Sequence, residues 1–259
     1  MTLQQFFTQH PKAALAFSGG SDSAYLLWAG RTWGQDVRPY YVSTPFQPAW
    51  EREDAQRLAR ELGVPLTVVE LDVLACPEVA ANPANRCYFC KKALFSALWQ
   101  RVRADGFSLL LDGTNASDDA QDRPGMRALS ELEVRSPLRE CGVTKAQLRA
   151  LSREAGLFTW DKPAYACLAT RIPTGTPITA RDLARVEGGE DALFALGFTD
   201  FRIRLRGDAA LIQLPQDQMD RAVAQQGALL EALSPHFSQV FLDLNPRKKE
   251  EFQDRKSVV

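Results

Sequence analysis

The chain has 259 residues, with five cysteines but only two histidines, His10 and His236. Its length suits one large domain or two smaller ones, and two distant histidines argue against His-rich zinc sites and Ser-His-Asp hydrolases. The 31 basic and 32 acidic residues nearly cancel, so bulk attraction to nucleic acid is not expected.

Membrane and secretion signals are missing from the sequence. No apolar stretch approaches the roughly 18 residues of a membrane span, and the first residues lack the basic and apolar regions of a secretory signal. We therefore expect a cytoplasmic protein without a membrane partner. In that reducing compartment cysteines act as thiols, metal ligands or catalysts more often than as disulfides. The five are Cys76, Cys87, Cys90, Cys141 and Cys167.

Apolar strands alternate with amphipathic helices in the first part of the chain. Strands are expected at 13–17, 37–42, 66–71 and 107–113. Pro39 weakens the second of these as a central strand. Helices are expected directly after 18–23, over 49–62, and after Cys90. This alternation predicts an α/β fold, a doubly wound parallel sheet with helices on both faces.

The pattern changes after Pro163. A proline-rich stretch is followed by a helix at 180–196, strands at 200–206 and 209–214, a helix at 217–232 and a strand at 236–244, with one further strand near 167–172. These elements predict a smaller C-terminal α+β domain. The domains expected are 1–165 and 166–259, and the charged end, 247–259, is expected to be a solvated tail.

A turn rich in glycine and serine joins the first strand to the first long helix. It contains Ser18, Gly19, Gly20 and Ser23. Glycines let backbone N–H groups approach an anion without a Cβ in the way, and a helix N-terminus adds free amides and its dipole. The turn is neither a Walker loop nor GxGxxG. It predicts a phosphate-binding loop, with an ordinary strand-to-helix turn as the alternative.

The sequence SGGSDS resembles the PP-loop of the ATP pyrophosphatases, which include NAD synthetase, GMP synthetase and tRNA thiolases. The resemblance implies that ATP binds with Mg²⁺, that a substrate oxygen is adenylated, and that pyrophosphate leaves. Asp22 would then help hold Mg²⁺ or order the loop. Val42 and Ser43, after the second strand, would contact adenine.

DGTN, at the end of the fourth strand, also fits that superfamily. Gly113 and Thr114 would lie beside the nucleotide. Asp118 and Asp119 follow as candidate metal or substrate carboxylates, with a solvated acidic turn as the alternative.

Three more segments indicate which family of this superfamily the chain resembles. They are NRCYFCKKALF, RSPLRECGVTKAQLR and KPAYACLATRIPTGTPIT. Together with the loop and DGTNASDD they resemble the LarE family of sulfur transferases, over about residues 13–215. The resemblance implies that a carboxylate of pyridinium dicarboxylate mononucleotide is adenylated and becomes a thiocarboxylate, for synthesis of a nickel-pincer nucleotide cofactor. Cys167 matches the cysteine that attacks the adenylate, and residues 166–259 would bind the substrate.

The source of the sulfur stays open. In some members this cysteine gives up its own sulfur. Members that also carry a C-x-x-C pair are thought to hold a [4Fe-4S] cluster on three cysteines, here Cys87, Cys90 and Cys167, since such clusters take thiolate ligands. A dithiol redox pair, or a zinc site completed by Cys76 or Cys141, is the alternative. Otherwise Cys76 and Cys141 are packing residues.

Cationic side chains supply candidate anion contacts. Arg202, Arg204 and Arg206 alternate along one strand and so share a face. The family resemblance favours Arg202 and Arg204 as ligands of the substrate phosphate, which the guanidinium fork suits. A solvated strand face is the alternative. Gln213, on the next strand, stands where relatives often carry an acidic residue.

Three more cations are less specific. Arg171, four residues after Cys167, is expected to favour its thiolate. Lys91 and Lys92 are candidate triphosphate contacts or part of a solvated helix face. Glu187 and Glu190, on the helix before the arginine strand, are weaker substrate or metal candidates.

Three other functions are less consistent with the sequence. A tRNA thiolase needs a basic RNA-binding surface or a zinc ribbon, and the near-neutral charge and single C-x-x-C oppose it. An amidating synthetase leaves Cys167 and the cysteine pair unexplained. A non-catalytic ATP-binding module would bind ATP without releasing pyrophosphate. Known relatives form symmetric oligomers, so a homo-oligomer is expected on resemblance.

Overall fold

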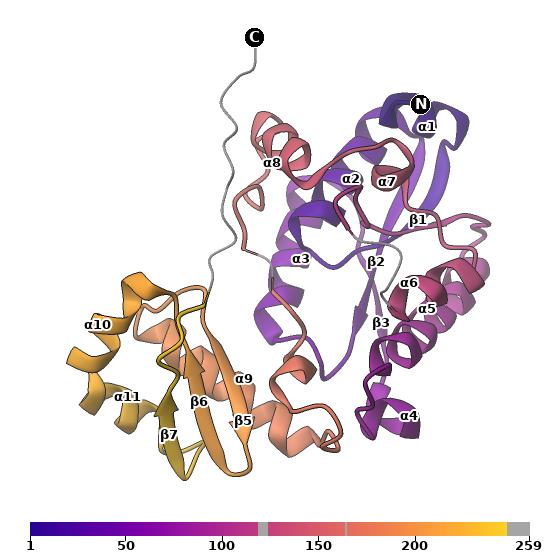
Figure 1. Cartoon of the computed structure of the whole chain (residues 1–259). Coiled ribbons are helices and arrows are strands. Elements are labelled where there is room, and N and C mark those ends of the chain that lie inside the picture. Colours follow the sequence, from indigo (N-terminus) through magenta and orange to yellow (C-terminus); the bar gives the residue numbers. More distant parts are fainter. Residues whose placement is uncertain (119–123, 164, 248–259) are drawn as a thin grey trace. The chain divides into compact units, whose positions relative to one another are not determined.

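The structure is a computed structural model that describes residues 1–118, 124–163 and 165–247 (Figure 1). The chain divides into two compact units, Met1–Tyr165 and Ala166–Val259. Asp119 and the predicted tail from Lys248 onward lie outside the described residues. Within the described ranges no helix is both long and apolar enough to cross a membrane.

The first unit is built on a parallel four-stranded sheet of order β3-β2-β1-β4. Its strands are β1 (Lys12–Ala16), β2 (Asp36–Ser43), β3 (Thr67–Glu70) and β4 (Leu110–Leu111). β1 pairs in parallel with β2 and with β4, and β2 with β3. The predicted parallel sheet is confirmed, although the fourth strand is much shorter than 107–113.

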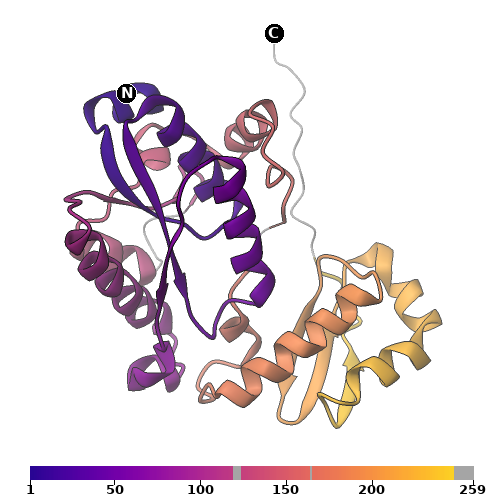
Figure 2. The ribbon, with the colours of Figure 1, turned by 180° about the vertical axis from the view of Figure 1, so that it is seen from behind.

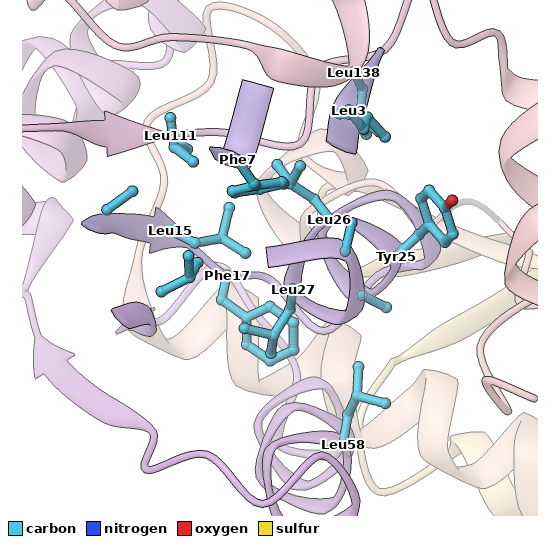
Figure 3. Packing of buried hydrophobic residues seen from close by; sticks show 14 of the residues in the cluster. Leu3, Phe7, Leu15, Phe17, Tyr25, Leu26, Leu27, Leu58, Leu111 and Leu138 are labelled. Carbon is cyan, nitrogen blue, oxygen red and sulfur yellow. The ribbon is translucent and has the colours of Figure 1, made fainter. Parts of the chain in front are cut away.

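Helices cover both faces of this sheet. Successive residues of β1 point to opposite faces, so they contact different helices. Leu15 joins a core with residues of α1 (Leu3–Gln9), α2 (Ser21–Trp33), α3 (Ala49–Glu61) and α8 (Lys145–Glu154). Figure 3 shows Leu15 close to Phe7, Leu26 and Leu27 in that core.

The opposite face carries a second core. Ala14 packs there with residues of α5 (Arg86–Ala104) and α6 (Pro124–Glu131). Seen from the front and from behind, α2 and α3 lie on one side of the sheet and α5 and α6 on the other (Figures 1 and 2). The shorter helices of the unit are η1 (Val73–Ala75), α4 (Pro77–Ala80) and α7 (Pro137–Glu140).

Pro39 sits in a central strand, contrary to the expectation from its sequence. It pairs with Leu15 of β1 in the middle of β2. The carbonyl of Tyr40 accepts from Phe17 and so points to β1, which directs the nitrogen of Pro39 toward β3. Pairing with β3 begins only at Thr67, opposite Tyr40. The missing N–H of Pro39 therefore removes no ladder bond.

The helix expected after Cys90 begins earlier. α5 starts at Arg86, so Cys87 and Cys90 both lie in its first two turns. They are three residues apart and share one side of the helix.

The second unit is a three-stranded sheet with helices. β5 (Arg202–Arg206) and β6 (Ala209–Gln213) pair antiparallel, and β6 pairs in parallel with β7 (Gln239–Leu242). α9 (Ala180–Ala195) runs along this sheet (Figure 2). This small second sheet with its helices agrees with the predicted α+β composition.

Two details of the second unit differ from the prediction. The expected strand at 167–172 is a 3-10 helix, η2 (Leu168–Arg171), because the Thr170 N–H and hydroxyl both donate to the Cys167 carbonyl, at 2.9 and 2.8 Å. The expected helix at 217–232 is two helices, α10 (Gln216–Ala224) and α11 (Gln226–Leu233). The break at Gln225 lies beside Gly227, a poor helix former.

Candidate functional site

A cavity of about 350 Å³ opens at the carboxyl ends of the parallel strands of the first unit. In the strand order β3-β2-β1-β4, the chain moves from β1 toward β3 and then returns to β4 on the other side of β1. Accordingly, α2 follows β1 on one face of the sheet, whereas α5 precedes β4 on the other. Open α/β sheets bind ligands at such a switch point. The predicted site residues that line the cavity are Ser18, Asp22, Ser23, Val42, Gly113 and Thr114.

Three predicted residues of the first unit are not part of the lining. Gly19 and Gly20 follow Ser18 directly in the same loop. Ser43 instead lines a separate hollow with Glu70 and Asp72, and Arg52 donates to its hydroxyl at 3.5 Å.

The loop after β1 is held by its own serines. The Ser18 N–H donates to Ser23 Oγ at 3.3 Å, and the two hydroxyl oxygens lie 3.1 Å apart. Ser23 Oγ also donates to the Gly20 carbonyl at 3.2 Å. Gly20 is the N-cap of α2 and makes no side-chain capping bond. The first N–H groups of α2 therefore have no such cap and point along the helix axis, as anion-binding helix ends do.

Two glycines allow close approach of the backbone around this loop. Gly19 has a φ of +72°, and a Cβ there would lie 3.1 Å from the backbone of Ala55 in α3. A Cβ on Gly113 would lie 3.0 Å from the Ser23 nitrogen. A larger residue at either position would push the loop out of place or fill the space over the first turn of α2.

Asp22 is fixed by two residues that the sequence did not single out. Lys145 Nζ, in the first turn of α8, donates to Asp22 Oδ1 and, at 2.9 Å, to Ser21 Oγ. The buried Asn115 donates to Asp22 Oδ2 at 3.1 Å. Both carboxylate oxygens are thus engaged within the first unit, and the choice between holding Mg²⁺ and ordering the loop stays a prediction.

Lys162 contacts the loop after β1 at the Gly19 carbonyl. Its ammonium donates to the Gly19 carbonyl at 3.4 Å and to Asp54 of α3 at 2.7 Å, and it lies over the ring of Trp50. A donor on the Gly19 carbonyl polarises the peptide whose N–H belongs to Gly20. Lys162 was not predicted, because it lies 143 residues from Gly19 in sequence.

One face of α5 forms the opposite wall of the cavity. Lys91, Leu94, Phe95 and Leu98 line it at helical spacing. The residues one turn earlier on this face are Cys87, four before Lys91, and Cys90, four before Leu94. Cys87 is exposed and Cys90 half-buried.

The cysteines divide between the two units. Cys87 and Cys90 belong to the first and Cys167 to the second, so the three-cysteine cluster stays a prediction. Among the described residues no three Cys, His, Asp or Glu side chains form a metal-binding group. Cys141 packs beside the core of the first unit, and burial raises the pKa of its thiol. Cys76 donates to Glu78 at 3.2 Å.

In the second unit, a buried ion pair supports the turn that carries Cys167. The side chains of Arg171 and Glu190 are 0% and 2% exposed, with N···O distances of 2.8 and 3.1 Å. Arg171 also donates to the Ala166 carbonyl and the Thr170 hydroxyl, both at 2.8 Å. Arg171 therefore binds the Ala166 carbonyl before Cys167 and the Thr170 hydroxyl after it, while Glu190 accepts from the same guanidinium.

The arginine strand does not present one solvated face. Arg202 is buried, Arg204 half-buried and Arg206 exposed. Burial, and then the charges of Arg171 and Arg247, lower the pKa of Arg202 to about 10, which leaves it charged at neutral pH. The same causes lower the pKa of Arg204. Positive charge concentrated in a partly buried place is an environment for an anion.

Gln213 links this strand to a carboxylate. Arg204 Nε donates to Gln213 Oε1 at 3.1 Å, and Gln213 Nε2 donates to Asp243 at 2.8 Å. The hydrogen bond from Gln213 lowers the pKa of Asp243. Asp243 thus places a carboxylate directly beside the Gln213 amide.

Of the remaining candidates, Asp118 lines the cavity and accepts from the Asn115 N–H at 3.1 Å. Lys92 is not in the lining. It contacts the Tyr88 hydroxyl and Glu131 instead, at 3.2 and 3.6 Å.

Comparisons with known proteins add to this geometry. No family model matches the chain. The pyridinium-3,5-bisthiocarboxylic acid mononucleotide synthase of Lactiplantibacillus plantarum is 34% identical over 90% of this chain and 86% of its own length. The chain belongs to this synthase family.

Two further relatives are uncharacterised proteins. An uncharacterised protein of Synechocystis is 38% identical over 85% of this chain and 83% of its own length. An uncharacterised protein of Methanocaldococcus jannaschii is 26% identical over 91% of this chain. Because the likeness to the synthase covers 90% of the chain, it extends beyond the first unit into the second.

Proposed function

We propose that this protein is an ATP-dependent sulfur transferase that converts a carboxylate of pyridinium dicarboxylate mononucleotide into a thiocarboxylate, for synthesis of a nickel-pincer nucleotide. Membership in the synthase family supports the product class. The observation that carries the proposal is that one face of α5 lines the cavity and continues directly into Cys87 and Cys90. A phosphate-type loop thus lines the cavity, and two thiols lie one helical turn beyond its lining on the same face of α5.

ATP fits the residues around this cavity. Its volume is within the range of small-ligand sites. The phosphates would lie at the first turn of α2, where Gly113 puts no Cβ beside the Ser23 nitrogen, and the base would lie near Val42. Mg²⁺ suits the oxygens of Asp118 and, once Lys145 or Asn115 releases it, of Asp22.

The first step is transfer of AMP. A carboxylate oxygen of the substrate attacks the α-phosphorus of ATP, the bond to the bridging oxygen breaks, and pyrophosphate leaves. The first N–H groups of α2 and the Lys145 ammonium would stabilise the charge on the phosphates. The product is an acyl adenylate, which is activated toward a sulfur nucleophile.

The second step replaces AMP by sulfur. If the Cys167 thiolate attacks the carbonyl carbon, AMP leaves and a thioester forms. Loss of the Cys167 α-proton then breaks the Cβ–S bond, which leaves the thiocarboxylate on the substrate and a dehydroalanine in the chain. If hydrosulfide attacks instead, AMP leaves and the thiocarboxylate forms directly.

A [4Fe-4S] cluster on Cys87, Cys90 and Cys167 would supply that hydrosulfide. The donor set fits in part: two thiols one helical turn apart suit one cluster, and they lie at the N-terminal end of α5, which favours negative charge. The third ligand would come from the turn that Arg171 and Glu190 support.

The phosphate of the mononucleotide would bind in the second unit. Arg202 and Arg204 are partly desolvated cations on one strand, and charge-assisted bonds from guanidinium to phosphate are strong in such surroundings. A homo-oligomer in the cytoplasm remains part of the proposal, on resemblance alone.

A pyrophosphate-release assay tests the proposed function. Purified protein with ATP, Mg²⁺ and the dicarboxylate mononucleotide should release pyrophosphate, and the substrate should gain the mass of a sulfur-for-oxygen exchange. ATP with unmodified tRNA should release none. Release that depends on tRNA, or ATP binding without release under any of these conditions, would contradict the proposal.

A further inference from the structure

The cavity of the first unit holds an uneven set of charges. Its described lining contains four carboxylates, Asp22, Glu51, Asp112 and Asp118, and Lys91 is the one cation among these lining residues. A nucleotide and a carboxylate substrate are both anions. A cavity that accepts them next to its own carboxylates needs positive charge at a defined place.

A glycine on the neighbouring helix directs the side chain of Lys91. An ideal Cβ on Gly125, in α6, would lie 2.8 Å from Lys91 Cδ, 3.1 Å from Cε and 3.5 Å from Nζ. Lys91 therefore runs across the space that any other residue at 125 would occupy. For Lys92 the structure shows a hydroxyl and a carboxylate as partners; for Lys91 Nζ it shows no partner within the described part of the chain.

We propose that Lys91 binds the substrate carboxylate that is to be adenylated and holds it beside the cysteine pair. This inference rests on the proposed function and adds the residue that positions the reacting group. Phosphate oxygens have their own donors on the opposite wall, in the loop at the first turn of α2. Lys91 belongs to the wall that carries the thiols.

The geometry of α5 sets the distance between Lys91 and the cysteine pair. Cys87 precedes Lys91 by four residues, so their Cα atoms are about 6 Å apart along α5. Lys91 therefore stands one helical turn from Cys87, on the face of α5 that lines the cavity together with the phosphate loop. The carboxylate must bring an oxygen to the α-phosphorus and then its carbonyl carbon to a sulfur, and Lys91 lies on the helix that carries both the cavity wall and the two thiols.

The test uses three single variants of the full chain. Lys91→Met removes the charge. Gly125→Ala keeps the charge but puts a Cβ where the Lys91 stem now lies, and it introduces a better helix former, so folding is preserved. Lys92→Met is the matched control on the next residue. The readouts are the ATP dissociation constant by calorimetry, and the KM for the mononucleotide at saturating ATP by pyrophosphate release.

We expect Lys91→Met to raise the mononucleotide KM about ten- to a hundredfold, which is the value of one charge-assisted hydrogen bond. Gly125→Ala should raise it several-fold, Lys92→Met should leave it unchanged, and ATP affinity should stay constant in all three. Lys91→Arg should restore part of the loss.

Other outcomes overturn the assignment in distinct ways. Weaker ATP binding in Lys91→Met would make Lys91 a phosphate ligand instead. An unchanged KM in both Lys91→Met and Gly125→Ala would remove it from the site. Absence of pyrophosphate release by the unaltered protein would instead refute the proposed function itself.

Discussion

Replacing Glu190 by glutamine should destabilise the second unit strongly. Glu190 accepts from Arg171 Nε and Nη2, at 2.8 and 3.1 Å, and from the Ile203 N–H at 3.1 Å. Glutamine keeps one acceptor oxygen but turns an N–H donor toward the guanidinium, which stays charged and buried. Breaking such a pair on one side costs about 3–5 kcal/mol.

The surroundings enlarge this cost. The charges of Arg171 and Arg247 already lower the pKa of Arg202, after the effect of its burial. Without the negative charge of Glu190, these guanidinium groups repel one another with less compensation. For a unit of this size, about 3 kcal/mol corresponds to a fall in Tm of at least about 12 °C.

The assay has to separate the two units. All five tryptophans, at 28, 33, 50, 99 and 160, belong to the first unit. Tryptophan fluorescence therefore follows the first unit, whereas far-UV circular dichroism and hydrogen exchange also follow the second. In Glu190→Gln we expect the dichroism transition to split, with an early phase that fluorescence does not show.

Two further variants provide comparisons for the loss of stability in Glu190→Gln. Glu61→Gln removes a carboxylate from an exposed pair with Arg57 and should cost at most about 0.5 kcal/mol. The double variant Arg171→Met, Glu190→Leu removes both charges and should be less destabilised than Glu190→Gln alone. If Glu190→Gln loses less than about 1 kcal/mol, the buried-pair reasoning is wrong.

Three other side chains, Lys162, Cys87 and Asp105, give further predictions. Lys162→Met should weaken ATP binding about tenfold by calorimetry, because it removes a charged donor from the Gly19 carbonyl. Cys87→Ala should abolish the visible absorbance of anaerobically reconstituted protein if the cluster exists. Hydrogen bonds, first from Arg101, lower the pKa of Asp105, so its stabilising contribution is present above the unfolded pKa near 4 and is lost as the pH falls. In Asp105→Asn that part of the acid dependence of unfolding should disappear.

Each of these has its own control. Lys162→Arg should recover much of the ATP affinity, and an unchanged affinity in Lys162→Met would separate this lysine from the loop. Cys141→Ala, a thiol of the same unit packed beside its core, should keep the absorbance. Equal acid dependence in Asp105→Asn and the unaltered protein would show that this carboxylate is not coupled to folding.

Local patterns in the sequence predicted the main elements of the fold. Apolar runs and helical spacing placed β1, β2, β3 and the helices α2, α3, α5 and α9 within a few residues of where they lie, whereas α1, α6 and α8 were not predicted. Pro39 misled the interpretation, because its effect depends on where β3 begins, which is a matter of register and not of composition. The strand expected at 167–172 failed because Thr170 closes a turn onto Cys167.

The site was predictable where chemistry follows a strand directly. The glycine loop and Gly113 fall at strand ends, so their positions could be inferred from alternation alone. Lys145, Asn115 and Lys162 act on the loop from far away in sequence, up to 143 residues. Their side chains are ordinary for a helix start or a loop, and only the tertiary fold gives them a partner.

The support around Cys167 has a consequence for the proposed route in which this cysteine gives up its own sulfur. Arg171 donates to the carbonyl of Ala166, and the Thr170 N–H and hydroxyl donate to the carbonyl of Cys167. These acceptors are main-chain oxygens, which remain when the side chain is altered. A chain that has lost this sulfur atom would keep the same turn, and a used molecule would be hard to tell from a fresh one by its fold.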